Sequence, residues 1–206
     1  MDRQNHIRLF ERIAPVYGLF FRRQVGVYRR AVNQHGSALF CPGETVLDIG
    51  CGTGALAFVL AEQGLQVTGI DGSDRMIRLS RRFNKTNNNR FICGDILHEP
   101  VQQQLRQHDL VVASYVLHGL DPATRSVLYS FMKTTARRLV IIMDYNQTEG
   151  SLTSLIERLE GGDYFNFIQK IQQEMRSHFS EVKTIQTGKR AAWYLCLCQE
   201  SNDGNA

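Results

Sequence analysis

The chain has 206 residues, of which 43% are hydrophobic and 21% are charged, which fits one globular domain and excludes a disordered chain. Its formal net charge at pH 7 is +4, but seven arginines against two acidic residues give residues 1–30 alone a charge of +5 and leave −1 for the rest. This distribution excludes the general basic surface of a protein that binds duplex nucleic acid and identifies a basic N-terminal segment.

Two helices are predicted before residue 45, at Gln4–Ile13 and Arg22–Gln34, with Pro15 and Gly18 between them. From Thr45 on, short apolar runs alternate with longer amphipathic ones. The strands predicted there are Val46–Ile49, Gln66–Ile70, Phe91–Cys93, Asp109–Ser114 and Leu139–Met143, and the helices are Ala55–Glu62, one capped by Ser73 that runs to about Phe83, and one that begins at Asp121-Pro122. Such alternation predicts an α/β fold with a parallel sheet covered by helices on both faces.

The end of the chain departs from this alternation. Apolar residues at spacings of three and four predict a helix over residues 163–179. Two strand-like runs follow, Glu181–Thr187 and Ala191–Gln199, and only three residues separate them. Because so short a link cannot contain a crossover helix, these two strands must be antiparallel. We therefore expect a seven-stranded, mostly parallel sheet with an antiparallel last strand, followed by a disordered polar tail at residues 201–206.

The sequence also predicts the compartment. No apolar run approaches the roughly 18 residues of a membrane helix, and the N-terminus has no apolar stretch typical of a secretion signal. The five cysteines are an odd number and their spacing fits no disulfide framework, which favours a reduced, cytoplasmic location. No set of Cys and His residues has zinc-ligand spacing, so no metal is expected.

The strongest chemical signal is the segment Asp48-Ile49-Gly50-Cys51-Gly52-Thr53-Gly54, which directly follows the first strand. Glycines at the carboxyl end of a strand permit positive φ and let a ligand approach the backbone. Seventeen residues after Gly54, Asp71 ends the second strand, where a carboxylate can accept both hydroxyls of a ribose.

Two cofactor classes fit this layout, and the charge of Asp48 discriminates between them. Gly50, Gly52 and Ala55 satisfy the relaxed glycine pattern of a dinucleotide-binding protein. A carboxylate 4 Å from a pyrophosphate charge would, however, be repelled by about 4 kcal/mol at an effective dielectric constant of about 20. A ligand that carries an ammonium and a sulfonium would instead be attracted, so the sequence favours an aminoacyl sulfonium cofactor.

The glycine segment resembles the first motif of class I S-adenosylmethionine-dependent methyltransferases. Further segments resemble later parts of the same family: Ile70-Asp71-Gly72-Ser73 with Met76, Gly94-Asp95-Ile96, and Ser114-Tyr115-Val116-Leu117-His118. The resemblance covers about residues 44–199, and Phe10–Tyr17 is similar to the N-terminal helix of ubiquinone/menaquinone-biosynthesis-type methyltransferases. It implies a Rossmann-like fold in a single methyltransferase domain, residues 1–200, with an N-terminal helical lid at 1–44 and a cofactor-binding core at 45–199.

The resemblance implies S-adenosylmethionine as cofactor and S-adenosylhomocysteine as product. The glycines would lie beneath the methionine part with Asp48 near its ammonium, Asp71 would hold the ribose, and Asp95 and the Ile96 N–H would bind the adenine. Ser114 would lie near the sulfonium and Tyr17 would cover the cofactor. The full implied set is Tyr17, Asp48, Gly50, Cys51, Gly52, Gly54, Asp71, Gly72, Ser73, Met76, Asp95, Ile96 and Ser114.

Catalysis by such an enzyme is expected to depend on orientation and the exclusion of water, because the methyl donor is already activated. If the acceptor must lose a proton, His118 is the candidate base, since it follows the fourth strand and titrates near neutrality. Asp144 and Tyr145 follow the fifth strand on the same sheet edge and can face the acceptor.

Aromatic residues outside the common core favour a small apolar or aromatic methyl acceptor. The arginines at 22, 23, 29 and 30 could attract an anionic acceptor or contact a membrane surface weakly. Several alternatives remain open: a non-catalytic cofactor-binding or partner-binding relative, an RNA methyltransferase without the usual base-binding motif, and a dehydrogenase. A monomer or homodimer is expected, without a nucleic-acid partner.

Overall fold

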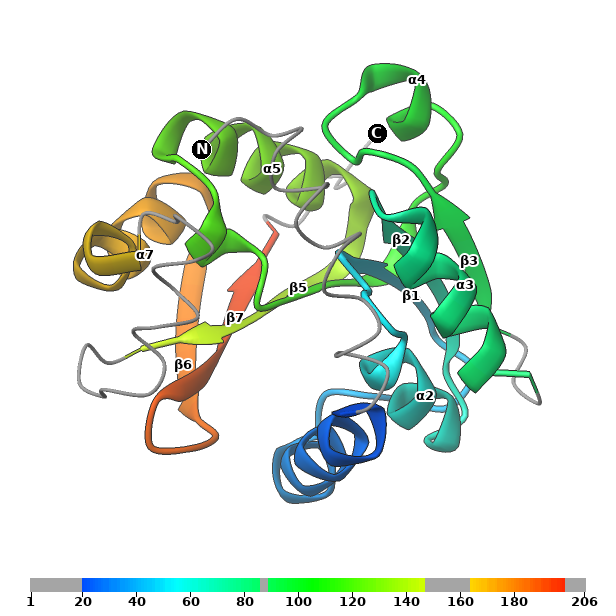
Figure 1. Ribbon diagram of the computed structural model, residues 1–206. Helices are drawn as coiled ribbons and strands as arrows, with labels where there is room; N and C mark the ends of the chain where they lie inside the picture. The colour runs from blue at the N-terminus through cyan, green and yellow to red at the C-terminus, as the bar shows by residue number, and fades with distance from the viewer. Residues whose placement is uncertain (1–19, 86–88, 147–163, 199–206) are drawn as a thin grey trace, which may run out of the picture.

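The computed structural model describes residues 20–85, 89–146 and 164–198, and within these ranges it contains one mixed sheet (Figure 1). Its seven strands are β1 (Thr45–Ile49), β2 (Gln66–Asp71), β3 (Arg90–Cys93), β4 (His108–Ser114), β5 (Ala136–Tyr145), β6 (Glu181–Gln186) and β7 (Ala191–Leu197). The strand order is β3-β2-β1-β4-β5-β7-β6. β1 to β5 pair in parallel, and β7 is antiparallel to both β5 and β6. The predicted fold class is confirmed, with the reversed strand inserted between β5 and β6.

The helices form a layer on each face of the sheet (Figure 1). The helices are one at residues 20–35, α2 (Ala55–Glu62), α3 (Asp74–Phe83), α4 (Glu99–Gln102), α5 (Pro122–Thr135) and α7 (Tyr164–His178), with a 3-10 turn η1 (Leu117–Gly119). Successive residues of a strand point to opposite faces, so neighbours such as Val46 and Leu47 belong to different apolar cores. The residue 20–35 helix, α2 and α3 cover one core, whereas α5 and α7 cover the other.

Most predicted boundaries agree with the structure because caps and periodicity determine them. Ser73 Oγ accepts from the Met76 N–H and Asp121 Oδ1 accepts from the Thr124 N–H, so α3 and α5 begin where the sequence predicts. β5 begins at Ala136, three residues before the predicted start, because it follows α5 directly and includes the exposed Arg137 and Arg138. It ends at Tyr145 rather than Met143, so Asp144 and Tyr145 are its last two residues and do not follow it, because both pair with β7. The predicted segment Gln4–Ile13 and the tail at 201–206 lie outside the described residues.

A ligand site is expected where the carboxyl ends of the neighbouring strands β1 and β4 lie side by side. From β1 the sheet continues to β2 and β3 on one side, and from β4 it continues to β5 on the other. Chain connections therefore run in opposite directions on either side of this pair. Open α/β sheets bind ligands in the crevice that such a reversal leaves at the carboxyl edge.

Candidate active site

The glycine loop after β1 has an unusual backbone. Gly50, Gly52 and Gly54 have φ angles of 66°, 51° and 75°, which side-chain-bearing residues rarely adopt. A Cβ on Gly50 would lie 2.5 Å from Cγ2 of Val116, so this glycine permits close packing against the segment after β4. A Cβ on Gly52 would meet nothing within 4 Å. The open space beside Gly52 is therefore where a ligand could approach the loop.

Asp71 joins the glycine loop to the end of β2. Its Oδ2 accepts from the Gly52 N–H at 2.9 Å, and its Oδ1 accepts from the Ser73 N–H at 2.8 Å. Gly72 lies half-buried between these contacts, while the buried Ser73 serves as the α3 cap and the buried Met76 packs beneath. The carboxylate thus lies at the loop, as expected for a residue that binds a ribose.

Asp48 is the second-last residue of β1 and is only 1% exposed. Its Oδ2 has no hydrogen-bond partner, and burial together with the nearby Asp71 charge raises the pKa of Asp48 to about 8. A buried carboxyl oxygen without a donor is costly, and an ammonium placed beside it would relieve that cost. This unpartnered acceptor therefore fits the ammonium at the methionine end of S-adenosylmethionine.

The third motif lies beside the second. The Gly94 N–H donates to the Asp71 carbonyl oxygen at 3.0 Å, which holds the turn after β3 against the end of β2. Asp95 Oδ1 accepts from the Leu97 N–H at 3.0 Å, and both Asp95 and Ile96 are half-buried. These residues are accessible on the same edge as Asp71, whereas the buried Cys51 side chain packs in the core behind the loop.

The residue 20–35 helix contributes Tyr28, which the sequence offered as one of several aromatic residues for the acceptor pocket but did not place beside Ser114. Tyr28 OH forms a 2.8 Å hydrogen bond with Ser114 Oγ at the end of β4. Burial raises the pKa of Tyr28, with smaller contributions from the charges of Asp48 and Asp144. Tyr28 lies on the same helical face as the buried Val25 and Val32. A polar hydroxyl on this otherwise apolar face is the sequence feature that could have indicated a contact with the site. The predicted lid residue Tyr17 lies outside the described residues.

The predicted base and its neighbours do come together. His118 Nδ1 lies 2.9 Å from Asp144 Oδ1, and both side chains are buried. Asp144 Oδ2 accepts from the backbone N–H groups of Leu117 and His118, and its Oδ1 also accepts from the Tyr145 N–H. Four donors therefore surround this carboxylate, which fixes its position and that of the imidazole.

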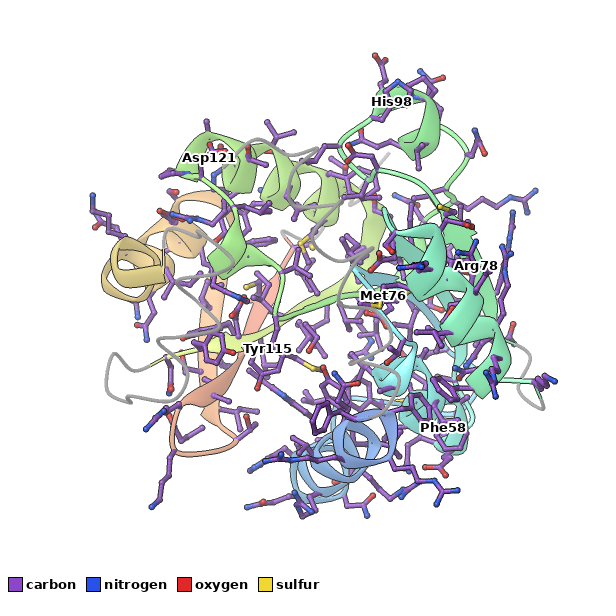
Figure 2. All side chains as sticks on the ribbon, in the orientation of Figure 1. Phe58, Met76, Arg78, His98, Tyr115 and Asp121 are labelled. Atoms are coloured by element: carbon purple, nitrogen blue, oxygen red, sulfur yellow. The ribbon has the colours of Figure 1, made fainter. Side chains whose placement is uncertain are left out.

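Aromatic rings connect His118 to a pocket. The Tyr145 ring lies 4.9 Å from the His118 ring and 5.0 Å from the Tyr115 ring, centroid to centroid. Tyr115 has a φ of 55°, and strained residues of this kind recur at active sites. It lines a pocket of about 240 Å³ between the residue 20–35 helix and the ends of β5 and β7, next to Tyr28 and Trp193. Tyr115 is labelled in Figure 2.

Comparison with known proteins agrees with this geometry. A model of the methyltransferase domain family matches residues 41–196. The chain belongs to this family. Family membership together with the glycine motif makes it an S-adenosylmethionine-dependent methyltransferase, and the predicted resemblance is confirmed.

Three similar proteins illustrate the relationship. An uncharacterized methyltransferase from Staphylococcus carnosus is 26% identical over 186 residues, 87% of each chain. The chloroplastic 2-phytyl-1,4-beta-naphthoquinone methyltransferase of Arabidopsis thaliana is 30% identical over 165 residues, 72% of this chain and 60% of that protein. The magnesium protoporphyrin IX methyltransferase of Synechocystis PCC 6803, solved with bound S-adenosylmethionine, shares the fold at 18% identity with a TM-score of 0.58, over 94% of this chain and 82% of its own.

Neither a membrane-spanning helix nor a cluster of metal ligands is present among the described residues. Within those ranges no helix of the methyltransferase has the length and apolar character needed to cross a membrane. No three His, Cys, Asp or Glu side chains in the described part of the chain are grouped as metal ligands.

Proposed function

We propose that this methyltransferase transfers a methyl group to a small aromatic or apolar molecule, and that His118 removes the proton that the acceptor loses. The hydrogen-bonded pair of His118 and Asp144, reached through aromatic contacts from a pocket, is the observation that carries the proposal.

On the cofactor side, different residues along the sheet edge from β3 to β4 would bind different parts of S-adenosylmethionine. Asp48 would pair with the ammonium, Asp71 would accept from the ribose hydroxyls, and Asp95 with the Ile96 N–H would hold the adenine. The glycine loop would permit the close approach, and Ser114, held by Tyr28, would lie near the methyl-donating end. When bound, the cofactor supplies an electrophilic methyl group.

On the acceptor side, Asp144 determines which nitrogen of His118 acts. A carboxylate that accepts from Nδ1 keeps the hydrogen on that nitrogen, so Nε2 is the atom that takes the acceptor's proton. Asp144 also stabilises the imidazolium that results. The burial of His118 excludes water from this transfer.

The size and lining of the pocket support a small acceptor. Its volume of about 240 Å³ is below the roughly 300–1,000 Å³ typical of drug-sized ligands, and Tyr28, Tyr115 and Trp193 provide aromatic walls. The name of the Arabidopsis relative contains a naphthoquinone, which is a planar ring system, with a phytyl chain attached.

The cofactor assignment is tested by calorimetry with S-adenosylhomocysteine. Wild-type protein should bind it and should not bind NAD, and Asp71→Asn should weaken binding at least tenfold because one ribose acceptor becomes a donor. Asp74→Asn, an exposed substitution on α3, is the matched control and should bind as wild type does. Unchanged binding by Asp71→Asn would refute the ribose assignment, and binding of NAD in place of S-adenosylhomocysteine would refute the proposed function.

A further inference from the structure

The pocket next to Tyr115 carries a single formal charge among the described residues that line it. That charge is Arg30, and its polar neighbour in the lining is Gln34, one helical turn later. No aspartate or glutamate is among these lining residues. An anion that enters the pocket would therefore meet one cation and no acid in the lining itself, while Asp48 and Asp144, whose charges reach Tyr28, are buried.

Arg30 differs from its neighbour Arg29 in its partners. Arg29 forms two hydrogen bonds with Glu62 on α2, at 3.0 and 2.8 Å. Arg30 makes no ion pair or side-chain hydrogen bond with any residue in the part of the chain that the structure describes. Its guanidinium is thus available to a ligand without the loss of an existing contact.

The opposite end of the pocket is built for an apolar ring. Tyr115 and Met143 lie at the ends of β4 and β5, and Trp193 belongs to β7. Arg30 and Gln34 lie four residues apart on one helix, so their side chains are neighbours on the same face. A ring against Tyr115 would therefore direct an attached acidic group toward two hydrogen-bond donors.

We infer that the methyl acceptor is a small aromatic molecule with an anionic group, such as a carboxylate, that Arg30 binds. This inference rests on the proposed function and specifies its substrate class. A guanidinium binds a carboxylate through parallel N–H donors, which adds orientation to charge attraction. The orientation would place the other end of the ring beside Tyr115, on the side that leads to His118.

The chain offers an internal reporter, because Trp193 is its one tryptophan and it lines the pocket. The ligands are 4-nitrobenzoate and 4-nitrobenzamide, which have the same ring and nitro group but differ in charge at one end. Nitroaromatic rings quench tryptophan fluorescence on contact. We expect the acid to quench wild-type fluorescence at concentrations at least tenfold lower than the amide does.

Arg30→Met tests the residue itself, since methionine keeps an unbranched apolar side chain but lacks the charge. It should remove the preference for the acid and leave the amide affinity within about twofold. Arg23→Met, an exposed substitution on the same helix outside the pocket, should retain the preference. Equal quenching of wild type by acid and amide, or an acid preference that persists in Arg30→Met, would overturn the inference.

The outcome can be separated from that of the proposed function. S-adenosylhomocysteine affinity, measured by calorimetry on the same samples, depends on the edge from β3 to β4 and should be the same in wild type and Arg30→Met. If wild type binds S-adenosylhomocysteine but shows no preference for the acid, only the acceptor class is refuted. If wild type does not bind S-adenosylhomocysteine, the proposed cofactor site is refuted.

Discussion

At the scale of single residues, His118 and Asp144 carry the proposed chemistry. His118→Asn keeps an N–H near Asp144 but has no atom in place of Nε2. We expect kcat to fall by about 10²–10⁴, the usual contribution of general acid–base catalysis, with S-adenosylhomocysteine affinity within twofold of wild type. The measurement is the initial rate of S-adenosylhomocysteine release in the presence of an acceptor that the wild-type enzyme methylates.

The matched control is His98→Asn, an exposed change at the start of α4 far from Tyr115 (Figure 2). It should leave kcat unchanged. If His118→Asn retains more than one-tenth of the wild-type kcat, His118 is not the base and the acceptor loses its proton elsewhere.

Asp48 gives a prediction about stability and pH. Its pKa is raised to about 8 in the folded protein, whereas an aspartate in the unfolded chain has a pKa near 3.9. The folded state therefore holds more protons between these values, so the ligand-free protein should lose stability as pH rises from about 4 to about 8. The slope from one group is at most about 1.4 kcal/mol per pH unit.

Asp48→Asn removes the titratable carboxyl group. Comparing the variant with wild type at two pH values therefore isolates the contribution of Asp48. At about pH 4 the variant, which resembles the protonated acid, should unfold in urea with nearly the wild-type free energy. At pH 8 it should be the more stable of the two. Parallel pH profiles for the two proteins would show that Asp48 is ionised in the folded state.

The sequence predicted these residues to different extents for physical reasons. Asp48, Asp71 and Asp144 each lie within the last two residues of a parallel strand, and the carboxyl ends of parallel strands meet at one edge of the sheet whatever their order. The contact of Tyr28 with Ser114 depends instead on how a helix outside the sheet packs. Periodicity along a helix shows that a face is buried but not which strand it contacts.

At the scale of elements, α5 and α7 are joined by an ion pair. Arg125 on α5 is fully buried and binds Glu174 on α7 through two hydrogen bonds of 2.7 and 2.8 Å. Its Nη1 also donates to the Leu120 carbonyl oxygen after η1, the turn that contains His118. The side chain of Glu174 is 21% exposed, so water reaches only one partner.

This asymmetry predicts which half of the pair matters more. Glu174→Ala leaves a buried guanidinium without its counter-charge and should cost about 3–5 kcal/mol of unfolding free energy. Arg125→Met should cost less because Glu174 keeps access to water. Urea unfolding measures both, and Arg78→Ala, which breaks an exposed pair on α3, should change stability by less than about 1 kcal/mol (Figure 2). A smaller loss in Glu174→Ala than in Arg125→Met would contradict this account.

Elements were predicted well where periodicity extended over several residues. The strands and the longer helices were recognised because burial on one or both faces leaves a pattern in the sequence. The helix α4 and the turn η1 were not predicted, since four and three residues are too short for a period. Their positions follow from the strands that they connect.

At the scale of the whole molecule, the residue 20–35 helix connects the cofactor side to the acceptor side. Phe21 stacks on Phe83 with centroids 4.1 Å apart, which anchors the helix to α3. Gln24 Oε1 accepts from Thr53 Oγ1 in the glycine loop, and Tyr28 contacts Ser114. The proposed pocket lies along the same helix. Cofactor binding at the loop should therefore stabilise the wall of the pocket as well.

Amide hydrogen exchange tests this coupling. S-adenosylhomocysteine should slow exchange at residues 50–54 through direct contact, and at residues 24–35 because the contacts to Thr53 and Ser114 transmit the stabilisation. Tyr28→Phe removes one of the two connections, so the helix should lose much of this protection while the loop retains it. Arg23→Gln, exposed and without a partner in the described part of the chain, should behave as wild type. If the loop is protected while the helix exchanges at its ligand-free rate in wild type, the two sides bind independently, and acceptor affinity should then not depend on bound cofactor.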